Sequence, residues 1–369
     1  MRRLGQRVAG LLPILLPVPL ISSIWRLAQM KPAHYVRPVR LAAFAAVAAA
    51  AALTALPAAA QVDPSKMVDQ FEATFGKFAG FRRSGAKGVC ATGEFTGNAA
   101  ARALSSASAF SGQPVPVIAR FSVGGANPAA PDNGRTQRNM ALQFNLPGGE
   151  TWQMGNINAP VFGAASPEQF LGRLASLQPD PATKAADPAK VKAFADANPD
   201  VLLQGRYFAS QPVPASFGAV NYWGVHAFAF VNAKGEKQWG KWIFEPVGGV
   251  QTLSDDEAKA KGPTFLFADL RERAPAGKVA FDFNLHLAAP GDKLDSAVVP
   301  LPEGRKKVTL GRLVIKSVAA DATGDCLSIT YNPMVLPKGV EPSTDPMLAG
   351  RAAPYVVGLG RRLVEGAKQ

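Results

Sequence analysis

Residues 345–362 read DPMLAGRAAPYVVGLGRR and are the most informative stretch of the chain. A helix predicted over Pro346–Glu365 places Arg351 and Tyr355, four residues apart, on one face. A guanidinium beside a phenol favours the phenolate, because an opposite charge stabilises the ionised form. A phenolate is a hard, anionic oxygen ligand that suits ferric iron. The same spacing also fits an Arg–Tyr pair on a helix surface, and Pro354 requires the helix to start or kink nearby.

Upstream of this stretch, short apolar segments separated by Gly, Asn, Pro and Asp predict β-strands. Helices are predicted over 67–78, from the Ser166-Pro167-Glu168 start, and in the solvent-facing segment 179–200. About eight strands without regular βαβ alternation predict an α+β fold, an antiparallel barrel surrounded by helices. The predicted strands cover residues 89–95, 115–123, 140–146, 152–154, 221–231, 237–244, 279–287, 307–318 and 326–331.

The charge of the chain is concentrated at its N-terminus. The 369 residues carry a net charge of +13, but residues 1–60 hold seven Lys or Arg and no acid. The remaining 309 residues therefore carry 33 basic and 27 acidic side chains, a net charge of +6. No run of Lys and Arg has the length of a phosphate-binding stripe, so we expect no nucleic-acid partner.

The first 60 residues are typical of a targeting region. An Ala-, Leu- and Val-rich stretch, Leu41–Leu56, follows a basic region and ends in PAAA. We predict a signal peptide over residues 30–60 and, upstream, an extension over residues 1–29 from a misassigned start. An uncleaved membrane anchor is the alternative. In either case the domain over residues 61–369 is exported, periplasmic or secreted, without stable membrane insertion of the mature domain.

Cys90 and Cys326 are the only cysteines. An oxidising compartment lets them pair, although two buried thiols that pack as small apolar groups fit the sequence equally well. The histidines of the predicted mature chain, His226 and His286, lie in apolar strand patterns, which favours a structural role. Gly124-Gly125 and Gly148-Gly149 lack the spacing and context of a nucleotide-binding loop.

Several blocks, in the right order, resemble the catalase-related peroxidases, small heme proteins that keep the catalase core. The resemblance runs from about Met67 to Arg362, nearly the whole predicted mature chain. The matching blocks are GAKGVC at 85–90, RFS at 120–122, NAPVF at 158–162, SPEQF at 166–170 and the helix with Arg351 and Tyr355.

The resemblance implies heme b as the cofactor of a catalase-like heme domain, a peroxide as substrate and a small-molecule reductant as partner. It makes Tyr355 the axial ligand of the iron and Arg351 its hydrogen-bonding partner. Arg82, Arg120 and Arg362 match positions that neutralise heme propionates, a task that suits the planar fork of a guanidinium.

On the other, distal face of the heme, the resemblance assigns an aromatic wall to Phe170 and the orientation of a catalytic histidine to Ser122. Gly85 stands where the family has that histidine, which moves a proton between the two peroxide oxygens. The iron-binding half therefore matches the family, while the peroxide-cleaving half departs from it.

A second departure concerns the distal asparagine of the family. Counting back from Pro160 puts Ile157 at that position, with Asn156 and Asn158 on either side. Asn158 is retained with Ser122 as a candidate catalytic residue. Asn139 also stands where the family has glycine.

These observations leave three functions open. The first is a heme peroxidase with altered distal chemistry, which reduces hydrogen or organic peroxides with an unknown electron donor. The alternative is an exported heme-binding protein, a sensor or carrier without peroxide turnover. The third is an exported barrel that binds another apolar ligand.

Overall fold

The computed structural model describes residues 62–320 and 323–366. The predicted signal peptide and the upstream extension lie outside the described residues.

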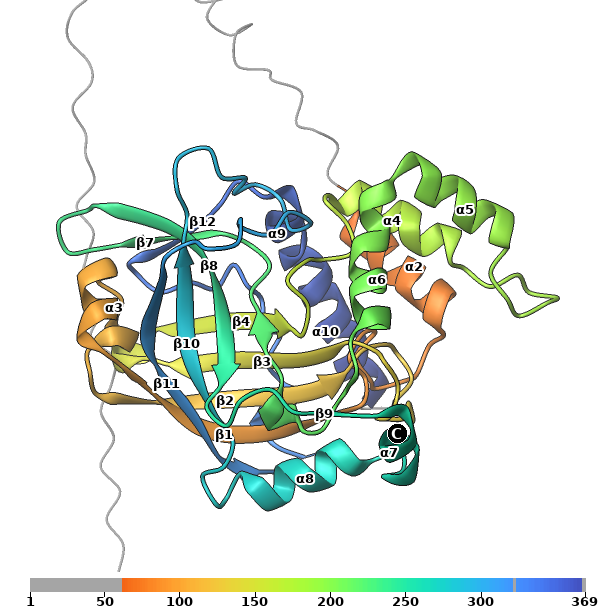
Figure 1. Cartoon of the computed structure of the whole chain (residues 1–369). Helices are drawn as coiled ribbons and strands as arrows, with labels where there is room; N and C mark the ends of the chain where they lie inside the picture. The colour runs from red at the N-terminus through yellow and green to blue at the C-terminus, as the bar shows by residue number, and fades with distance from the viewer. Residues whose placement is uncertain (1–61, 321–322, 367–369) are drawn as a thin grey trace, which may run out of the picture. The chain divides into compact units, whose positions relative to one another are not determined.

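The centre of the structure is a closed antiparallel barrel, as the sequence predicts (Figure 1). Closure occurs because β10 pairs with β11 on one side and with β8 on the other. In order around the barrel, the strands are β10 (Ala280–Leu287), β11 (Lys307–Val318), β1 (Gly88–Gly97), β2 (Pro114–Val123), β3 (Arg138–Asn145), β4 (Thr151–Ile157), β6 (Tyr222–Trp223) and β8 (Lys237–Pro246).

The sheet continues beyond β8 through β7 (Phe228–Val231) and β12 (Val340–Pro342). The predicted turn at residues 232–235 joins β7 to β8, with the Gly235 amide donating to the Asn232 carbonyl at 3.0 Å. A separate pair is formed by β5 (Val213–Pro214) and β9 (Thr252–Leu253).

Aromatic side chains fill the barrel interior. Phe283 stacks on Phe244 with ring centroids 4.5 Å apart, and Trp152 packs edge-on against Trp242. Alternate residues of β3 and β4 are buried in this core, as a period of two requires. The aromatic side chains thus occupy the interior of the barrel and leave no room there for a large ligand.

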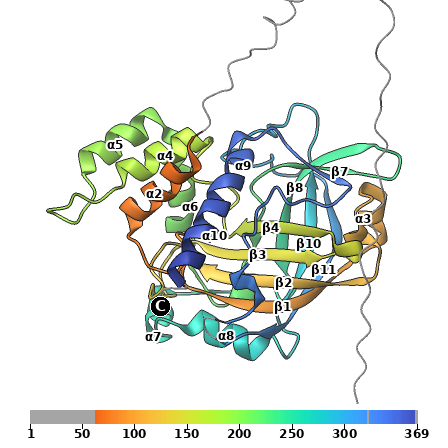
Figure 2. The ribbon, with the colours of Figure 1, turned by 180° about the vertical axis from the view of Figure 1, so that it is seen from behind.

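Helices lie around the barrel, and Figure 2 shows α9 (Pro346–Gly350) and α10 (Ala352–Gly366) beside the ends of β3 and β4. Arg83 bonds both Glu365 of α10, at 2.6 Å, and Glu72 of α2, at 2.7 Å, which fixes these two helices to each other. None of the helices in the described ranges is long and apolar enough to span a membrane. The remaining helices are α2 (Pro64–Phe75), α3 (Ala99–Leu104), α4 (Pro167–Ser176), α5 (Pro188–Ala197), α6 (Leu203–Ser210), α7 (Asp255–Ala260) and α8 (Phe265–Arg273).

Four predicted elements differ from the structure. The strand predicted over 221–231 is interrupted between β6 and β7, and the strand predicted over 326–331 is wrong, because a 3₁₀ turn over Asp325–Leu327 and irregular chain replace it. The helix predicted over 346–365 breaks at Arg351. In 179–200 the α-helix is confined to α5, followed by a short 3₁₀ turn.

Cys90 and Cys326 form a disulfide, with Cα atoms 5.4 Å apart and 236 residues between them in sequence. The bond joins β1 to the irregular segment that follows β11. The structure confirms that the two cysteines pair, and the alternative of two separate buried thiols is wrong.

Candidate functional site

Tyr355 lies in the first turn of α10, where it accepts two hydrogen bonds from Arg351. Arg351 Nε is 2.9 Å from the phenol oxygen, and Nη2 of the same guanidinium also donates to it. Pro354 is accommodated because amides in the first turn have no partner within the helix. Two charge-assisted donors on one phenol oxygen suit an oxygen that carries negative charge, as an iron ligand does.

A further pair of buried side chains positions Arg351. Its Nη1 lies 3.0 Å from His226 Nε2, and His226 Nδ1 lies 2.7 Å from a carboxylate oxygen of Asp345. Burial lowers the pKa of His226 to about 4, so the ring is neutral at physiological pH. Since Arg351 only donates, Nε2 accepts its hydrogen bond and Nδ1 donates to Asp345. The four residues form a continuous chain from Asp345 to Tyr355.

The protonation state of Asp345 is set by opposing effects. Its burial favours the protonated form, but hydrogen bonds from His226 and from the Met347 amide lower the pKa of Asp345 below its usual value. The carboxylate therefore stays charged and fixes the tautomer of His226.

His226 lies in an apolar sequence pattern that predicts a structural histidine, and it was not among the predicted site residues. The structure confirms that it is buried and hydrogen-bonded, but its partner is a predicted site residue 125 positions away. Position 226 also lies between strands rather than in one. The only feature of the sequence that marks His226 is its place in an apolar segment, and this does not identify its hydrogen-bond partner.

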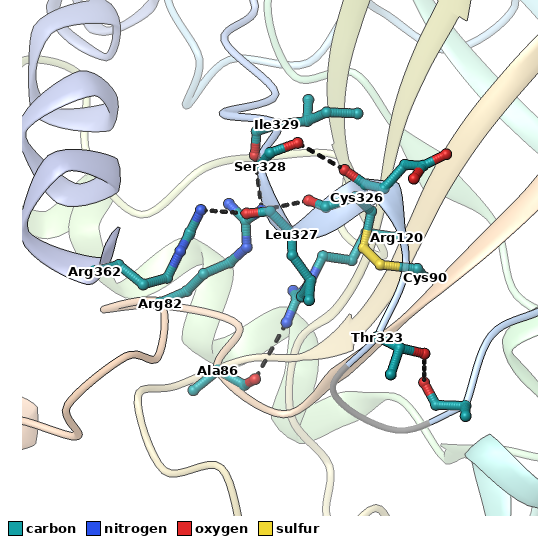
Figure 3. Close-up of a disulfide and its surroundings, with 12 residues drawn as sticks. Arg82, Ala86, Cys90, Arg120, Thr323, Cys326, Leu327, Ser328, Ile329 and Arg362 are labelled. Atoms are coloured by element: carbon teal, nitrogen blue, oxygen red, sulfur yellow. Dashed lines mark hydrogen bonds between the residues drawn. A yellow bond between two sulfur atoms is a disulfide. The ribbon is translucent and has the colours of Figure 1, made fainter. Parts of the chain in front are cut away.

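Arg82, Arg120 and Arg362, which come from three distant parts of the chain, gather around the disulfide (Figure 3). Burial, with a smaller contribution from a neighbouring arginine of the cluster, lowers the pKa of each to about 10. In the described part of the chain, none of the three forms an ion pair with a carboxylate. Their guanidinium groups donate to backbone carbonyls instead.

The cluster leaves hydrogen-bonding capacity unused. The Nε of Arg120 and the hydroxyl of Tyr331 are buried without a hydrogen-bond partner among the described residues. The Tyr331 ring lies 5.7 Å from the Arg82 guanidinium, and burial raises the pKa of its hydroxyl. Arg120 is buried with an unsatisfied donor, and Arg82 and Arg362 beside it are partly buried. Such a cluster fits a carboxylate-bearing ligand, because an unpaired buried charge is costly.

Gly85 faces Ser122, as the sequence analysis expects of the distal position. A Cβ atom at residue 85 would lie 2.9 Å from Ser122 Oγ, 3.4 Å from Asn139 Nδ2 and 3.6 Å from Arg120 Nη1. Asn139 Nδ2 donates to Ser122 Oγ at 3.1 Å, and Gln137 Nε2 donates to Asn139 Oδ1 at 2.5 Å. An amide from the neighbouring strand therefore occupies the partner position beside Ser122. The sequence analysis noted Asn139 only as a departure from the family.

The three residues around the expected distal asparagine point in different directions. Asn156 turns into the barrel, where it donates to the Met140 carbonyl and accepts from Trp242 Nε1 at 2.7 Å. Asn158 is also buried, and its Oδ1 accepts from the Arg138 amide at 2.7 Å. Ile157 lies outside the barrel in an apolar cluster. The oxygen of Asn158, a predicted catalytic residue, is thus used to hold the end of β3.

Phe170 contributes to an aromatic wall beside Ile157. Its ring centroid lies 5.5 Å from Phe71 and 5.4 Å from Phe162, and Met347 joins the same cluster. The Ser166 N-cap predicted from the sequence begins α4 and so places Phe170 one turn into the helix. The wall is preformed and apolar.

Two glycines leave room for site arginines. A Cβ atom at Gly88 would lie 2.5 Å from Arg120 Nη2, and one at Gly155 would lie 3.1 Å from Arg351 Nη2. Both positions are on the strands that face α10 and the disulfide. Larger residues there would displace the guanidinium groups, so these glycines are required by close approach rather than by backbone conformation.

Comparison with known proteins identifies the family. The catalase family model matches residues 80–368. A catalase-related peroxidase of Synechococcus elongatus is 38% identical over 305 residues, which cover 83% of this chain and 90% of that protein. One from Mycolicibacterium paratuberculosis is 30% identical and covers 79% of this chain and 92% of its own length.

Among solved structures, catalase A from Saccharomyces cerevisiae superposes with a TM-score of 0.69 at 19% identity, over 77% of this chain. A bacterial catalase gives the same TM-score at 20% identity, over 78% of this chain. The chain spans 61% and 58% of the lengths of these two structures. The barrel, the helices around it and the two relatives in sequence agree: the chain belongs to the catalase family and, within it, to the catalase-related peroxidases.

Proposed function

We propose that the chain is a heme-dependent peroxidase that reduces hydrogen peroxide or organic peroxides with a small-molecule electron donor. The observation that carries the proposal is the Tyr355 oxygen held by Arg351, near the cluster of Arg82, Arg120 and Arg362, which has no carboxylate partner among the described residues. Heme b matches this donor set, because it offers one ferric iron and two carboxylates. When bound, the heme supplies the redox chemistry that splits the O–O bond.

The side of the site that contains Tyr355 is built to hold iron. Tyr355 would be the axial ligand, and Arg351 would keep positive charge next to the ligating oxygen. His226 and Asp345 restrict Arg351 to one orientation, because each hydrogen bond of the chain fixes the next. Arg82, Arg120 and Arg362 would pair with the propionates.

The opposite side of the site orients a peroxide without moving its proton. Ser122 and Asn139 offer hydrogen bonds, but neither a hydroxyl nor an amide exchanges protons readily near neutral pH. Gly85 contributes no side chain. We therefore expect slow peroxide cleavage, because a missing general acid–base typically costs ~10²–10⁴-fold. Oxygen-evolving dismutation needs proton transfer for two peroxides in each cycle, so oxidation of an organic donor should persist better.

An absorbance scan of the purified, heme-loaded chain before and after addition of hydrogen peroxide tests the proposal. Oxidation of a phenolic donor, with little oxygen release at an electrode, is the expected result. Heme binding without any turnover would assign the chain to the alternative function, a sensor or carrier. Absence of heme binding, or oxygen release at the rate of a catalase, would contradict the proposal.

Export of the domain over residues 61–369 is part of the same proposal. The Cys90–Cys326 disulfide supports an oxidising compartment, periplasmic or extracellular, since such bonds are rare in reducing cytosol. The signal peptide over residues 30–60 supplies the route.

Replacing both Arg120 and Arg362 by alanine should weaken heme binding about tenfold or more, because a charge-assisted pair contributes about 1.5–3 kcal/mol. Heme titration followed by absorbance measures the effect. Arg312→Ala is the matched control, because Arg312 pairs with Asp282 at the surface and should leave the titration unchanged. Superimposable curves for the double variant and the wild type would contradict the propionate role.

A further inference from the structure

The segment that follows β11 is irregular, and it packs on the barrel by side chains, with Ile329 and Tyr331 in one apolar cluster with Ile118 and Ala141. We define residues 323–331 as the clamp loop. Its backbone hydrogen bonds are local: the amides of Leu327, Ser328 and Ile329 each donate to a carbonyl three residues earlier. One end of the loop is held where Gln153 Oε1 accepts from the Asn332 amide at 2.7 Å. Near its middle, the covalent attachment to β1 is the disulfide of the fully buried Cys326.

The clamp loop holds two of the three arginines of the cluster by its carbonyls (Figure 3). Arg82 Nη2 donates to the Cys326 carbonyl at 2.9 Å and to the Ile329 carbonyl at 2.7 Å. Arg362 Nη2 donates to the Leu327 carbonyl at 2.6 Å. Both guanidinium groups therefore take their positions from the residues next to the disulfide.

The third arginine belongs to the other half of the disulfide. Cys90 of β1 is the register partner of Arg120 on β2. The Cys90 carbonyl also accepts from the Ala319 amide at 2.9 Å, at the point where the chain leaves β11. A single covalent bond thus joins the strand pair that carries Arg120 to the loop that orients Arg82 and Arg362.

The cluster needs such a restraint because its members repel one another. Arg120 lowers the pKa of Arg82, Arg362 lowers that of Arg120, and Arg82 lowers that of Arg362, in each case after the larger effect of burial. A loop released from β1 would let Arg82 and Arg362 move apart toward solvent. Binding of a carboxylate ligand would then include the free-energy cost of bringing the two arginines together again, which lowers the affinity of the ligand.

We propose that the Cys90–Cys326 disulfide is a clasp that preorganises the arginine cluster, so that retention of a carboxylate-bearing heme depends on the oxidised state of this pair. The proposal rests on the proposed function, because heme is the ligand. A dithiol would open the clasp by thiol–disulfide exchange: it loses two electrons and two protons and forms its own disulfide, while Cys90 and Cys326 each become a thiol.

Heme transfer from the oxidised chain to excess apomyoglobin, followed by absorbance, measures the dissociation rate. We expect Cys90→Ala/Cys326→Ala to release heme at least ~tenfold faster than the wild type. This estimate assumes that the charge-assisted pairs between the arginines and the heme carboxylates become weaker. Leu270→Ala is the control for lost stability, because Leu270 is fully buried in α8, outside the cluster and the clamp loop. Its transfer rate is compared at a temperature where both variants are equally folded.

Non-additivity separates a clasp from general support of the fold. In the Arg120→Ala/Arg362→Ala background, removal of the two cysteines should change the transfer rate little, because the groups that the clasp positions are already gone. If the cysteine variant fails to fold, the wild type reduced by a dithiol in the native state, with both thiols verified by alkylation and mass, replaces it.

The outcomes are distinct. Normal heme uptake by the oxidised chain with no acceleration beyond the Leu270→Ala control would overturn the clasp alone. A full acceleration that persists in the arginine background would also overturn it. Failure of the oxidised wild type to bind heme would overturn the proposed function and, with it, the clasp.

Discussion

Tyr355→Phe is expected to abolish the ferric-phenolate absorbance of the heme-loaded chain and to lower peroxide turnover by at least ~10²-fold. Phenylalanine keeps the ring but removes the oxygen, so the iron loses its proposed ligand. The Nε and Nη2 groups of Arg351 lose their acceptor at the same time, which leaves partly buried donors unsatisfied. The measurement is the visible spectrum of the ferric protein, with turnover of a phenolic donor as the second readout.

Tyr207→Phe is the matched control, because Tyr207 is a half-buried tyrosine of α6 that packs on Trp223. It should leave both the spectrum and the turnover unchanged. Charge-transfer bands that persist in Tyr355→Phe would show that another residue ligates the iron. The assignment of Tyr355 of α10 as the axial ligand would then be wrong.

The barrel could be predicted because its strands follow simple rules. Strands β3 and β4 alternate between buried and outward-facing residues, which is the period that the sequence shows. The N-cap of α4 was also readable, since Ser166 accepts from the Gln169 amide as predicted. Local patterns therefore identified most of the elements that position the site.

The elements that were wrong depend on contacts between distant residues. The segment over 221–231 is apolar except for Asn221 and His226, but Gly224 lies against the indole of Trp242, and a side chain there would collide with it. The chain is irregular at that point, which turns His226 toward Asp345. Cys326 is buried in a 3₁₀ turn rather than a strand because the disulfide, not a ladder of hydrogen bonds, attaches it to β1.

The site likewise contains local features that the sequence predicts and contacts between distant residues that it does not. The Arg351–Tyr355 pair lies within one helical turn, so spacing alone predicted it. The link to His226 spans 125 residues, and no motif encodes it. On the opposite side, the contact of Asn139 with Ser122 arises from the register of β3 on β2, which a single sequence does not reveal.

Gly85→His, combined with Asn139→Gly, is expected to raise the rate of the peroxide reaction by ~10²-fold, the lower end of the range for a general acid–base. A Cβ atom at residue 85 would lie 2.9 Å from Ser122 Oγ, which is too close, so the Ser122 hydroxyl has to shift before it can orient an imidazole there. Its pKa lies near neutral pH, which lets it accept and return a proton. Gly85→His alone should give at least ~tenfold, because Asn139 still engages Ser122 and crowds the new ring.

Gly85→His has a conformational cost that is small enough for the variant to fold. Gly85 has a φ of +63°, in the left-handed region, where a Cβ costs about 1–2 kcal/mol. Histidine is among the residues that adopt this region more often than most. The gain should stay below the upper limit of ~10⁴-fold because Ile157 offers no second polar group on that side.

Stopped-flow measurement of the change in heme absorbance after mixing with hydrogen peroxide determines the rate for each variant. Asn139→Gly alone removes the amide without adding an acid–base group, and Gly85→Gln with Asn139→Gly adds a polar side chain that does not titrate near neutral pH. Both controls should stay within a few-fold of the wild type, so a gain confined to histidine isolates proton transfer as its cause. A folded, heme-loaded histidine variant that reacts no faster than the glutamine variant would show that residue 85 does not face the bound peroxide. The reaction would then have to use a group outside the Ser122–Asn139 side of the site.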